Sequence, residues 1–256
     1  MSVCKNWSGI YIQDLHLRRG SHQIFSGFSL ELEAGRVTAL LGASGAGKTS
    51  LLDCLAGLLP ADRGTIRGVG PVSYLFQEPR LLPWYTLERN IMLPMESLLG
   101  TKAALERARH FLDLVELGEK ATSLPSQCSG GQRQRCALAR AFAYPSSTLL
   151  MDEAFQAQDI KLKLRLMELT EELLGAGAGQ CGGQNQPPRT TVLVTHDVSE
   201  ALALAHRVLV LSGSPLQVVG DFPGAGKELP MASRYISPSA ATQRSREAIL
   251  SLLCVR

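Results

Sequence analysis

The sequence predicts an α/β fold in which a mostly parallel β-sheet is flanked by helices. Short β-branched or aliphatic runs, bounded by glycine, proline or polar residues, are typical of strands buried on both faces. Stretches with apolar residues at helical spacing separate these runs, as the crossover helices of a parallel sheet require. The expected strands cover residues 37–41, 72–76, 148–151, 191–195 and 208–211.

Two further regions are expected around the first part of this sheet. Residues 11–32 alternate more loosely between apolar and polar positions, which favours an antiparallel β subdomain. Residues 80–146 carry no strand signal over most of their length and are predicted to form an inserted helical subdomain. Within it, apolar residues recur at helical spacing at Leu105, Ala108, Leu112 and Val115.

The last part of the chain divides into a loop and a tail. Residues 175–189 read GAGAGQCGGQNQPPR, a composition that predicts a flexible loop between a helix and the strand at 191. We expect one domain over residues 1–220 and a C-terminal tail over 221–256. The tail is expected to be irregular and to end in a short amphipathic helix with Ala248, Ile249, Leu252 and Leu253 on its apolar side.

Composition argues against several functional classes. A net charge of +3 is too small to indicate nucleic acid as a partner. The six cysteines, at positions 4, 54, 128, 136, 181 and 254, form no CxxC pair and no zinc spacing. No apolar run reaches the ~20 residues that span a bilayer, and residues 1–9 contain no secretion-type apolar stretch. We therefore expect a soluble protein with reduced thiols.

A phosphate-binding loop follows the first buried strand. Residues 42–49 read GASGAGKT and match GxxxxGK[ST], directly before a predicted helix over residues 50–59. Glycines permit a tight backbone path that points successive N–H groups at phosphate oxygens, and the helix N-terminus adds partial positive charge. Lys48 would neutralise the β- and γ-phosphates, and Thr49 would ligate Mg²⁺. The alternative is a glycine-rich turn that contains Lys-Thr by chance.

A second motif is the apolar strand at 148–151, which ends in Asp152 and Glu153. Carboxylates are costly to bury, so they are expected at the carboxyl edge of the sheet, where ligands bind in open α/β folds. Asp152 can hold Mg²⁺ through water, and Glu153 can orient and deprotonate an attacking water. A strand that merely ends in solvated acids is the alternative.

A third motif is a helix start at residues 128–132, which read CSGGQ. Ser129 is a natural N-cap, and Cys136, Ala139 and Phe142 continue at helical spacing. This turn is a second anion site, built like the phosphate loop from backbone N–H groups and a helix N-terminus.

From about Tyr11 to Gly220 the sequence resembles the ATP-binding cassette (ABC) family. Five features stand in the family's order: the phosphate loop, Gln77, the SGGQ turn, Asp152-Glu153 and His196. The resemblance implies a P-loop NTPase core and ATP hydrolysis with Mg²⁺. It implies catalytic roles for Glu153, for His196 as the switch histidine at the γ-phosphate, and for Gln77, which touches Mg²⁺ and the water. Metal contacts would come from Thr49, Gln77 and Asp152. Nucleotide contacts would come from Gly42, Ala43, Ser44, Gly45, Ala46, Gly47, Lys48, Thr49, Ser50, Gln77, Ser129, Gly130, Gly131, Gln132, Asp159 and His196.

The resemblance also implies a head-to-tail dimer in which Ser129 and Gly131 contact the γ-phosphate bound by the other copy and Asp159 communicates across the dimer. The chain departs from the family pattern at four positions. Cys128 replaces the usual leucine and is expected to be a packing residue. Ala154 replaces the proline that normally follows the glutamate. Gln158 puts the packing of the cross-dimer loop in doubt, and Arg19 falls where an aromatic side chain usually stacks on adenine.

Residues 77–90, QEPRLLPWYTLERN, are similar to the corresponding segment of the ATPases of nitrate, sulfonate and taurine importers, and thiamine-related importers look similar too. The resemblance implies separate permease subunits, a solute-binding protein, no nucleic acid, and a peripheral position on the cytoplasmic face of the inner membrane. Trp84 and Tyr85 would contact the permease or pack in the core of the helical subdomain. The alternatives are a non-transport cytosolic ABC-type ATPase, or a kinase or GTPase that shares only the phosphate loop.

Overall fold

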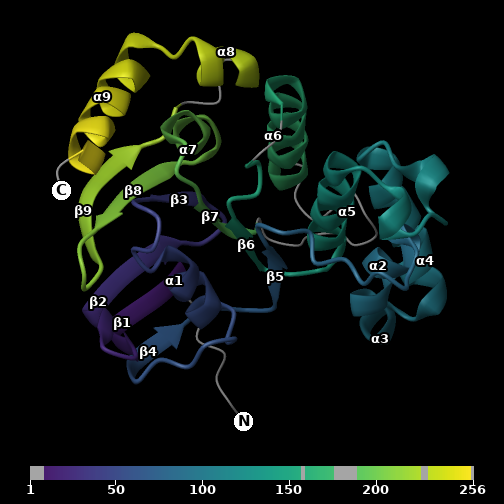
Figure 1. The fold of residues 1–256 in the computed structure, drawn as a ribbon, viewed down its shortest axis with the longest axis horizontal. Helices are drawn as coiled ribbons and strands as arrows, with labels where there is room; N and C mark the ends of the chain where they lie inside the picture. Colours follow the sequence, from purple (N-terminus) through teal and green to yellow (C-terminus); the bar gives the residue numbers. More distant parts are fainter. Residues whose placement is uncertain (1–8, 157–158, 176–188, 226–229, 255–256) are drawn as a thin grey trace.

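The computed structural model describes residues 9–156, 159–175, 189–225 and 230–254 (Figure 1). Its centre is a six-stranded sheet with the order β5-β6-β7-β3-β8-β9. The first five strands are parallel, and β9 pairs antiparallel with β8. The strands are β3 (Val37–Leu41), β5 (Val72–Leu75), β6 (Thr148–Asp152), β7 (Thr190–Val194), β8 (Arg207–Ser212) and β9 (Gln217–Pro223). The predicted fold class is therefore confirmed.

The central strands are apolar at nearly every position because both faces of the sheet are covered. Every residue of β3, β6 and β7 is buried. Helix α1 (Lys48–Leu55) follows β3, α6 (Ile160–Gly175) connects β6 to β7, and α7 (Val198–Leu204) connects β7 to β8. This double burial is why these strands could be found from the sequence, with bounds that differ by at most one residue from those observed.

A three-stranded antiparallel subdomain packs against α1, with the order β2-β1-β4. Its strands are β1 (Gly9–Arg19), β2 (His22–Glu33) and β4 (Arg63–Arg67). The antiparallel pairing predicted for residues 11–32 is present. Sequence analysis missed β4, because four of its five residues are exposed and it carries no apolar pattern.

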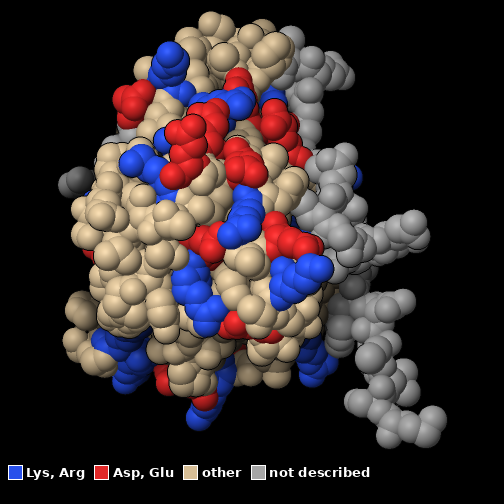
Figure 2. Space-filling model, turned by 90° about the vertical axis from the view of Figure 1, so that its right-hand side faces the viewer, with Lys and Arg blue, Asp and Glu red and all other residues tan. Residues whose placement is uncertain are grey.

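Residues 80–146 contain only helices and turns, as predicted. The helices are α2 (Leu87–Met92), α3 (Glu96–Leu99), α4 (Thr101–Leu114) and α5 (Gly130–Ala143), with 3₁₀ turns at Leu93–Met95, Gly118–Lys120 and Pro125–Gln127. Phe111 and Leu112 of α4 pack in the same core cluster as Leu87 of α2 and Phe142 of α5. On the face that this subdomain turns outward, acidic and basic side chains are interspersed (Figure 2).

The C-terminal part is more regular than expected. Gly220 pairs with Val210 inside β9, so the predicted irregular tail from residue 220 onward is wrong, and a boundary after 220 would cut a strand. Five of the seven residues of β9 are exposed at the sheet edge, so the strand gives little sequence signal. Helices α8 (Met231–Ile236) and α9 (Ala240–Cys254) follow, and the predicted apolar residue Ile249 of α9 is fully buried.

The predicted flexible loop at 175–189 falls largely on residues 176–188, which lie outside the described residues. Gly175 ends α6. Arg189 is buried and donates to the carbonyl oxygens of Phe142 (2.9 Å) and Tyr144 (2.8 Å), so it belongs to the packed core and not to a surface loop. Among the described helices, none is long and apolar enough to cross a bilayer.

Candidate functional site

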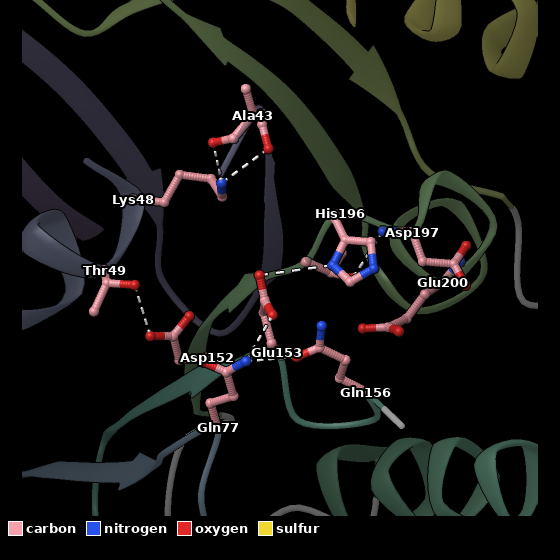
Figure 3. Close-up of polar contacts among 12 residues, drawn as sticks. Ala43, Lys48, Thr49, Gln77, Asp152, Glu153, Gln156, His196, Asp197 and Glu200 are labelled. Carbon is pink, nitrogen blue, oxygen red and sulfur yellow. Dashed lines mark hydrogen bonds and ion pairs between the residues drawn. The ribbon is translucent and has the colours of Figure 1, made fainter. Parts of the chain in front are cut away.

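Four predicted motifs meet at the carboxyl edge of the parallel sheet. Strands β3, β5, β6 and β7 run in the same direction, so the residues that follow them converge. Gly42 follows β3, Gln77 lies just beyond β5, Asp152 ends β6, and His196 lies just beyond β7. Figure 3 shows Lys48, Asp152, Glu153, Gln77 and His196 around one space.

The glycines of the phosphate loop are required by its backbone path. Gly45 and Gly47 have φ of 79° and 106°, in the left-handed region that side chains disfavour. A Cβ on Gly42 would lie 2.4 Å from the carbonyl oxygen of Leu211. Helix α1 begins directly after Gly47, which leaves its first N–H groups facing the loop.

Lys48 is held over this loop by the loop's own carbonyl groups. Its side chain is 5% exposed, and Nζ donates to the carbonyl oxygens of Gly42 and Ala43, each at 2.8 Å. Burial lowers the pKa of Lys48, while Glu153 and Asp152 act in the opposite direction. An ammonium placed between a nest of N–H groups and two carboxylates can exchange its carbonyl partners for phosphate oxygens. Ser44 and Ala46 complete the turn, and Ser50 is buried in the first turn of α1.

Thr49 and Asp152 meet across the sheet edge. Thr49 Oγ1 donates to Asp152 Oδ2 at 2.9 Å, although 103 residues separate them. Burial raises the pKa of Asp152, and the hydrogen bond from Thr49 opposes that rise. Hydroxyl and carboxylate oxygens are the donors that Mg²⁺ takes, so these residues fit the ion that their motif implies.

Glu153 stands in a strained conformation between Gln77 and His196. Its φ is +47°, unusual for a residue with a side chain, and its N–H donates to the carbonyl oxygen of Val194 at 2.9 Å. Glu153 Oε2 accepts from Gln77 Nε2 at 3.1 Å, and Oε1 lies 3.6 Å from His196 Nδ1. The Glu153 carboxylate therefore lies in the space beyond the end of β6, within reach of both Gln77 and His196.

Gln156 and Gln134, which were not predicted as site residues, also contact this group of residues. Gln77 Nε2 also donates to Gln156 Oε1 at 2.6 Å. Gln134, buried on α5, donates from Nε2 to the carbonyl oxygen of Ala154 at 2.8 Å. Ala154 itself is buried, so the residue that replaces the usual proline is packed and hydrogen-bonded. Neither glutamine carried a signal in the sequence, because its role depends on a tertiary contact.

The Ser129 turn is well formed but exposed. Ser129 Oγ accepts from the N–H of Gln132 at 3.2 Å, and the N–H of Ser129 donates to Gln132 Oε1 at 2.9 Å, which makes a capping box. Ser129 and Gly130 are exposed, whereas Cys128 is buried and acts as the expected packing residue. The N–H groups of Gly130 and Gly131 lie in the first turn of α5, where no intrahelical partner exists.

Among the residues that the structure describes, neither Asp159 nor Arg19 makes a hydrogen bond or ion pair with the phosphate loop. Asp159 is exposed and caps α6, accepting from the N–H of Leu162 at 3.0 Å. Gln158 lies outside the described residues. Arg19 is exposed at the end of β1. Helix α5 lies with the helical subdomain, on the other side of β5 and β6 from α1 in the view of Figure 1.

Comparison with known proteins decides the family. Residues 25–156, just over half of the chain, match the ABC transporter family model. The aliphatic sulfonates import ATP-binding protein SsuB 1 of Xanthomonas axonopodis pv. citri is 37% identical over 96% of both chains. The chain belongs to the ABC transporter family. The corresponding SsuB of Granulibacter bethesdensis is 41% identical to this ABC protein over 79% of each chain.

Solved ABC structures share its fold. A dimeric ATP-binding cassette in a post-hydrolysis state, bound to ADP and phosphate, superposes with a TM-score of 0.72 at 23% identity. The superposition covers 85% of this chain and 99% of that one. A dimeric bacterial ABC transporter cassette superposes equally well at 24% identity. The family match and the similarity to the SsuB proteins identify the chain as an ATP-binding, ATP-hydrolysing protein of the ABC type.

Proposed function

We propose that this chain hydrolyses ATP as one of two copies in a head-to-tail dimer that drives separate membrane subunits of an importer. The observation that carries the proposal is the meeting of the Lys48 loop, Asp152 and Glu153 at one sheet edge, while the Ser129 turn faces outward. Because the Ser129 turn is exposed, the N–H groups at this helix N-terminus are open to a phosphate held by a second molecule.

The proposed chemistry divides between neighbouring side chains. Lys48 neutralises the β- and γ-phosphates, and Thr49, Asp152 and Gln77 hold Mg²⁺, which supplies further charge neutralisation. Glu153 takes a proton from water as the water oxygen bonds to the γ-phosphorus, and the bond to the bridging oxygen of ADP breaks. His196, 3.6 Å from Glu153, contacts the γ-phosphate and keeps the water in line. In the dimer, Ser129 and Gly131 reach the same phosphate from the other copy, and Asp159 lies at the contact between copies.

The test of this chemistry is the Glu153→Gln variant. Replacing the carboxylate by an amide keeps its size but removes the base, so turnover should fall roughly 100- to 10,000-fold with ATP affinity retained. Because ATP stays uncleaved, the variant should also form an ATP-dependent dimer that sedimentation can measure. Unchanged hydrolysis would show that Glu153 is not the base.

The proposed partner is a permease at the cytoplasmic face of the inner membrane. Trp84 is 68% exposed and packs edge-on against Tyr85, with a centroid distance of 6.3 Å, so core packing does not account for its indole ring. Leu98, at 58%, and Leu99 are also exposed in the helical subdomain. Large exposed apolar side chains favour a protein contact. Trp84→Ala should weaken co-purification with a membrane subunit while leaving the basal ATPase rate unchanged.

The proposed solutes are small sulfonates, because the relatives are aliphatic sulfonate import proteins; taurine, nitrate and thiamine-related solutes remain in the same test. A strain that lacks this chain should lose ATP-dependent uptake of a labelled alkanesulfonate, and wild-type chain should restore it. If the strain instead loses uptake of taurine, nitrate or a thiamine-related compound, that compound is the transported solute. Co-purification with ribosomes or DNA, and with no membrane protein, would favour the non-transport alternative.

A further inference from the structure

Next to His196 lies a polar cluster that the proposed chemistry does not use. It consists of Lys163 on α6, Asp197 and Glu200 at the start of α7, and Tyr235 on α8. Lys163 Nζ lies 2.6 Å from Asp197 Oδ2 and 3.0 Å from Glu200 Oε2. The Tyr235 hydroxyl donates to the same Asp197 Oδ2 at 2.7 Å. Three helices that are distant in the sequence therefore share one carboxylate.

Asp197 is also held by hydrogen bonds to the neighbouring backbone and to Thr195. Its Oδ1 accepts from the N–H groups of Ser199 at 2.9 Å and Glu200 at 3.2 Å, which caps α7. Its own N–H donates to Thr195 Oγ1 at 3.1 Å. Thr195 is itself buried. The backbone on both sides of His196 is thus held by hydrogen bonds, and the charged contacts of Asp197 are the strongest of them.

His196 depends on this backbone for its place. Its side chain is 54% exposed, and its ring lies 3.6 Å from Glu153 Oε1. Because more than half of the His196 side chain is exposed, neighbouring side chains constrain its ring only weakly. A pocket of about 120 Å³ is lined by Glu153, His196 and Lys163, and also by Asp197 and Glu200, so the cluster and the hydrolytic pair border the same space (Figure 3).

The C-terminal segment contributes to the cluster through α8. Arg234, beside Tyr235 and 4% exposed, donates from Nη1 to the carbonyl oxygen of Ala203 at 2.6 Å and pairs through Nη2 with Glu171. These contacts tie α8 to the end of α7 and to α6. Figure 1 shows α8 lying over α6 and α7. Tyr235 is therefore delivered to Asp197 by an anchored helix.

We propose that Tyr235, together with Lys163, is a positioning residue for ATP hydrolysis: the pair holds Asp197, and through it His196, beside Glu153. The C-terminal segment that carries α8 is then part of the hydrolytic apparatus. The inference rests on the proposed role of His196. It assigns no contact with ATP to Tyr235 or Lys163, which act through Asp197.

The first experiment compares two Tyr→Phe variants. Tyr235→Phe removes only the hydroxyl that Asp197 accepts, and it should lower kcat about three- to tenfold, with an unchanged KM for ATP and an unchanged melting temperature. Tyr74→Phe is the matched control. It removes another partly buried hydroxyl, which donates to Asp53 at 3.3 Å on a different element, and it should leave kcat unchanged.

The second experiment observes His196 directly, without hydrolysis. In protein labelled at its histidine rings, the His196 resonances, assigned from a His196→Gln sample, should shift and broaden in Tyr235→Phe and stay unchanged in Tyr74→Phe. Lys163→Met should reproduce the shift and the loss of kcat, and Lys163→Arg, which keeps a cationic donor, should recover most of both.

The outcomes separate the two ideas. A kcat of Tyr235→Phe within twofold of wild type, together with unmoved His196 resonances, would overturn the positioning role. A lowered melting temperature with unmoved resonances would also overturn it, because Tyr235 would then act only on stability. If His196→Gln keeps full turnover while Tyr235→Phe still moves the His196 signals, Tyr235 does position His196, but the proposed role of His196 in hydrolysis fails, and with it the role of Tyr235 in hydrolysis.

Discussion

The chain contains two glycine-containing turns, each at the N-terminus of a helix, and they differ in what surrounds them. The Lys48 loop follows a strand that is buried at every position, and its lysine is buried and hydrogen-bonded to the loop itself. The Ser129 turn begins a helix of the inserted subdomain, and Ser129 and Gly130 are exposed. The lysine of the first turn is hydrogen-bonded within its own chain. The second turn has N–H groups that are accessible to another molecule. From this difference we propose that each ATP site is shared, with the Lys48 loop supplied by one copy and the Ser129 turn by the other.

Lys48→Ala should give the largest effect on nucleotide binding. It removes the cation that meets the β- and γ-phosphates, so ATP affinity of the isolated chain should fall roughly 100-fold, which is about 2.7 kcal/mol. Equilibrium titration with a fluorescent ATP analogue measures it, with the exposed Lys102→Ala as control. Normal ATP affinity of Lys48→Ala would show that the Lys48 loop does not bind the phosphates.

Ser129→Ala should have a different signature. It removes the side-chain cap and the hydroxyl offered to the other copy, so turnover should fall about tenfold. ATP affinity of the isolated chain should not change, because Ser129 does not reach the nucleotide of its own chain. Steady-state kinetics and titration together separate the two effects, with Ser126→Ala in the preceding turn as control. Weaker binding by the isolated chain would show that Ser129 serves its own loop.

Arg189→Met tests how firmly α5, the helix that begins at the Ser129 turn, is anchored to the rest of the fold. The Arg189 guanidinium donates to two carbonyl oxygens at the end of α5, and burial lowers its pKa to about 10. Its loss should reduce the free energy of unfolding by about 1.5–3 kcal/mol, measured by denaturant titration. The exposed Arg36→Met variant should change stability little. An equal effect of both variants would show that Arg189 does not anchor α5.

The sequence predicted those features that local pattern determines. Buried strands such as β3 and β6 are largely apolar runs, Gly42 follows β3 and Asp152 ends β6, so fold and chemistry could be found together. Edge strands β4 and β9 were missed because most of their residues are exposed, which leaves neither a buried apolar run nor a clear alternation. The cluster of Lys163, Asp197 and Tyr235 was missed because its members meet only after α6, α7 and α8 have packed.

The most direct measurement of the central claim mixes two inactive variants, Lys48→Ala and Ser129→Arg. In a head-to-tail dimer, the mixed pair has one site with both changes and one site with neither. About half of the dimers in an equal mixture are mixed, so about a quarter of all sites should be intact and ATPase activity should reappear. A mixture as inactive as its parents, with mixed dimers shown to form, would contradict an ATP site shared between two copies.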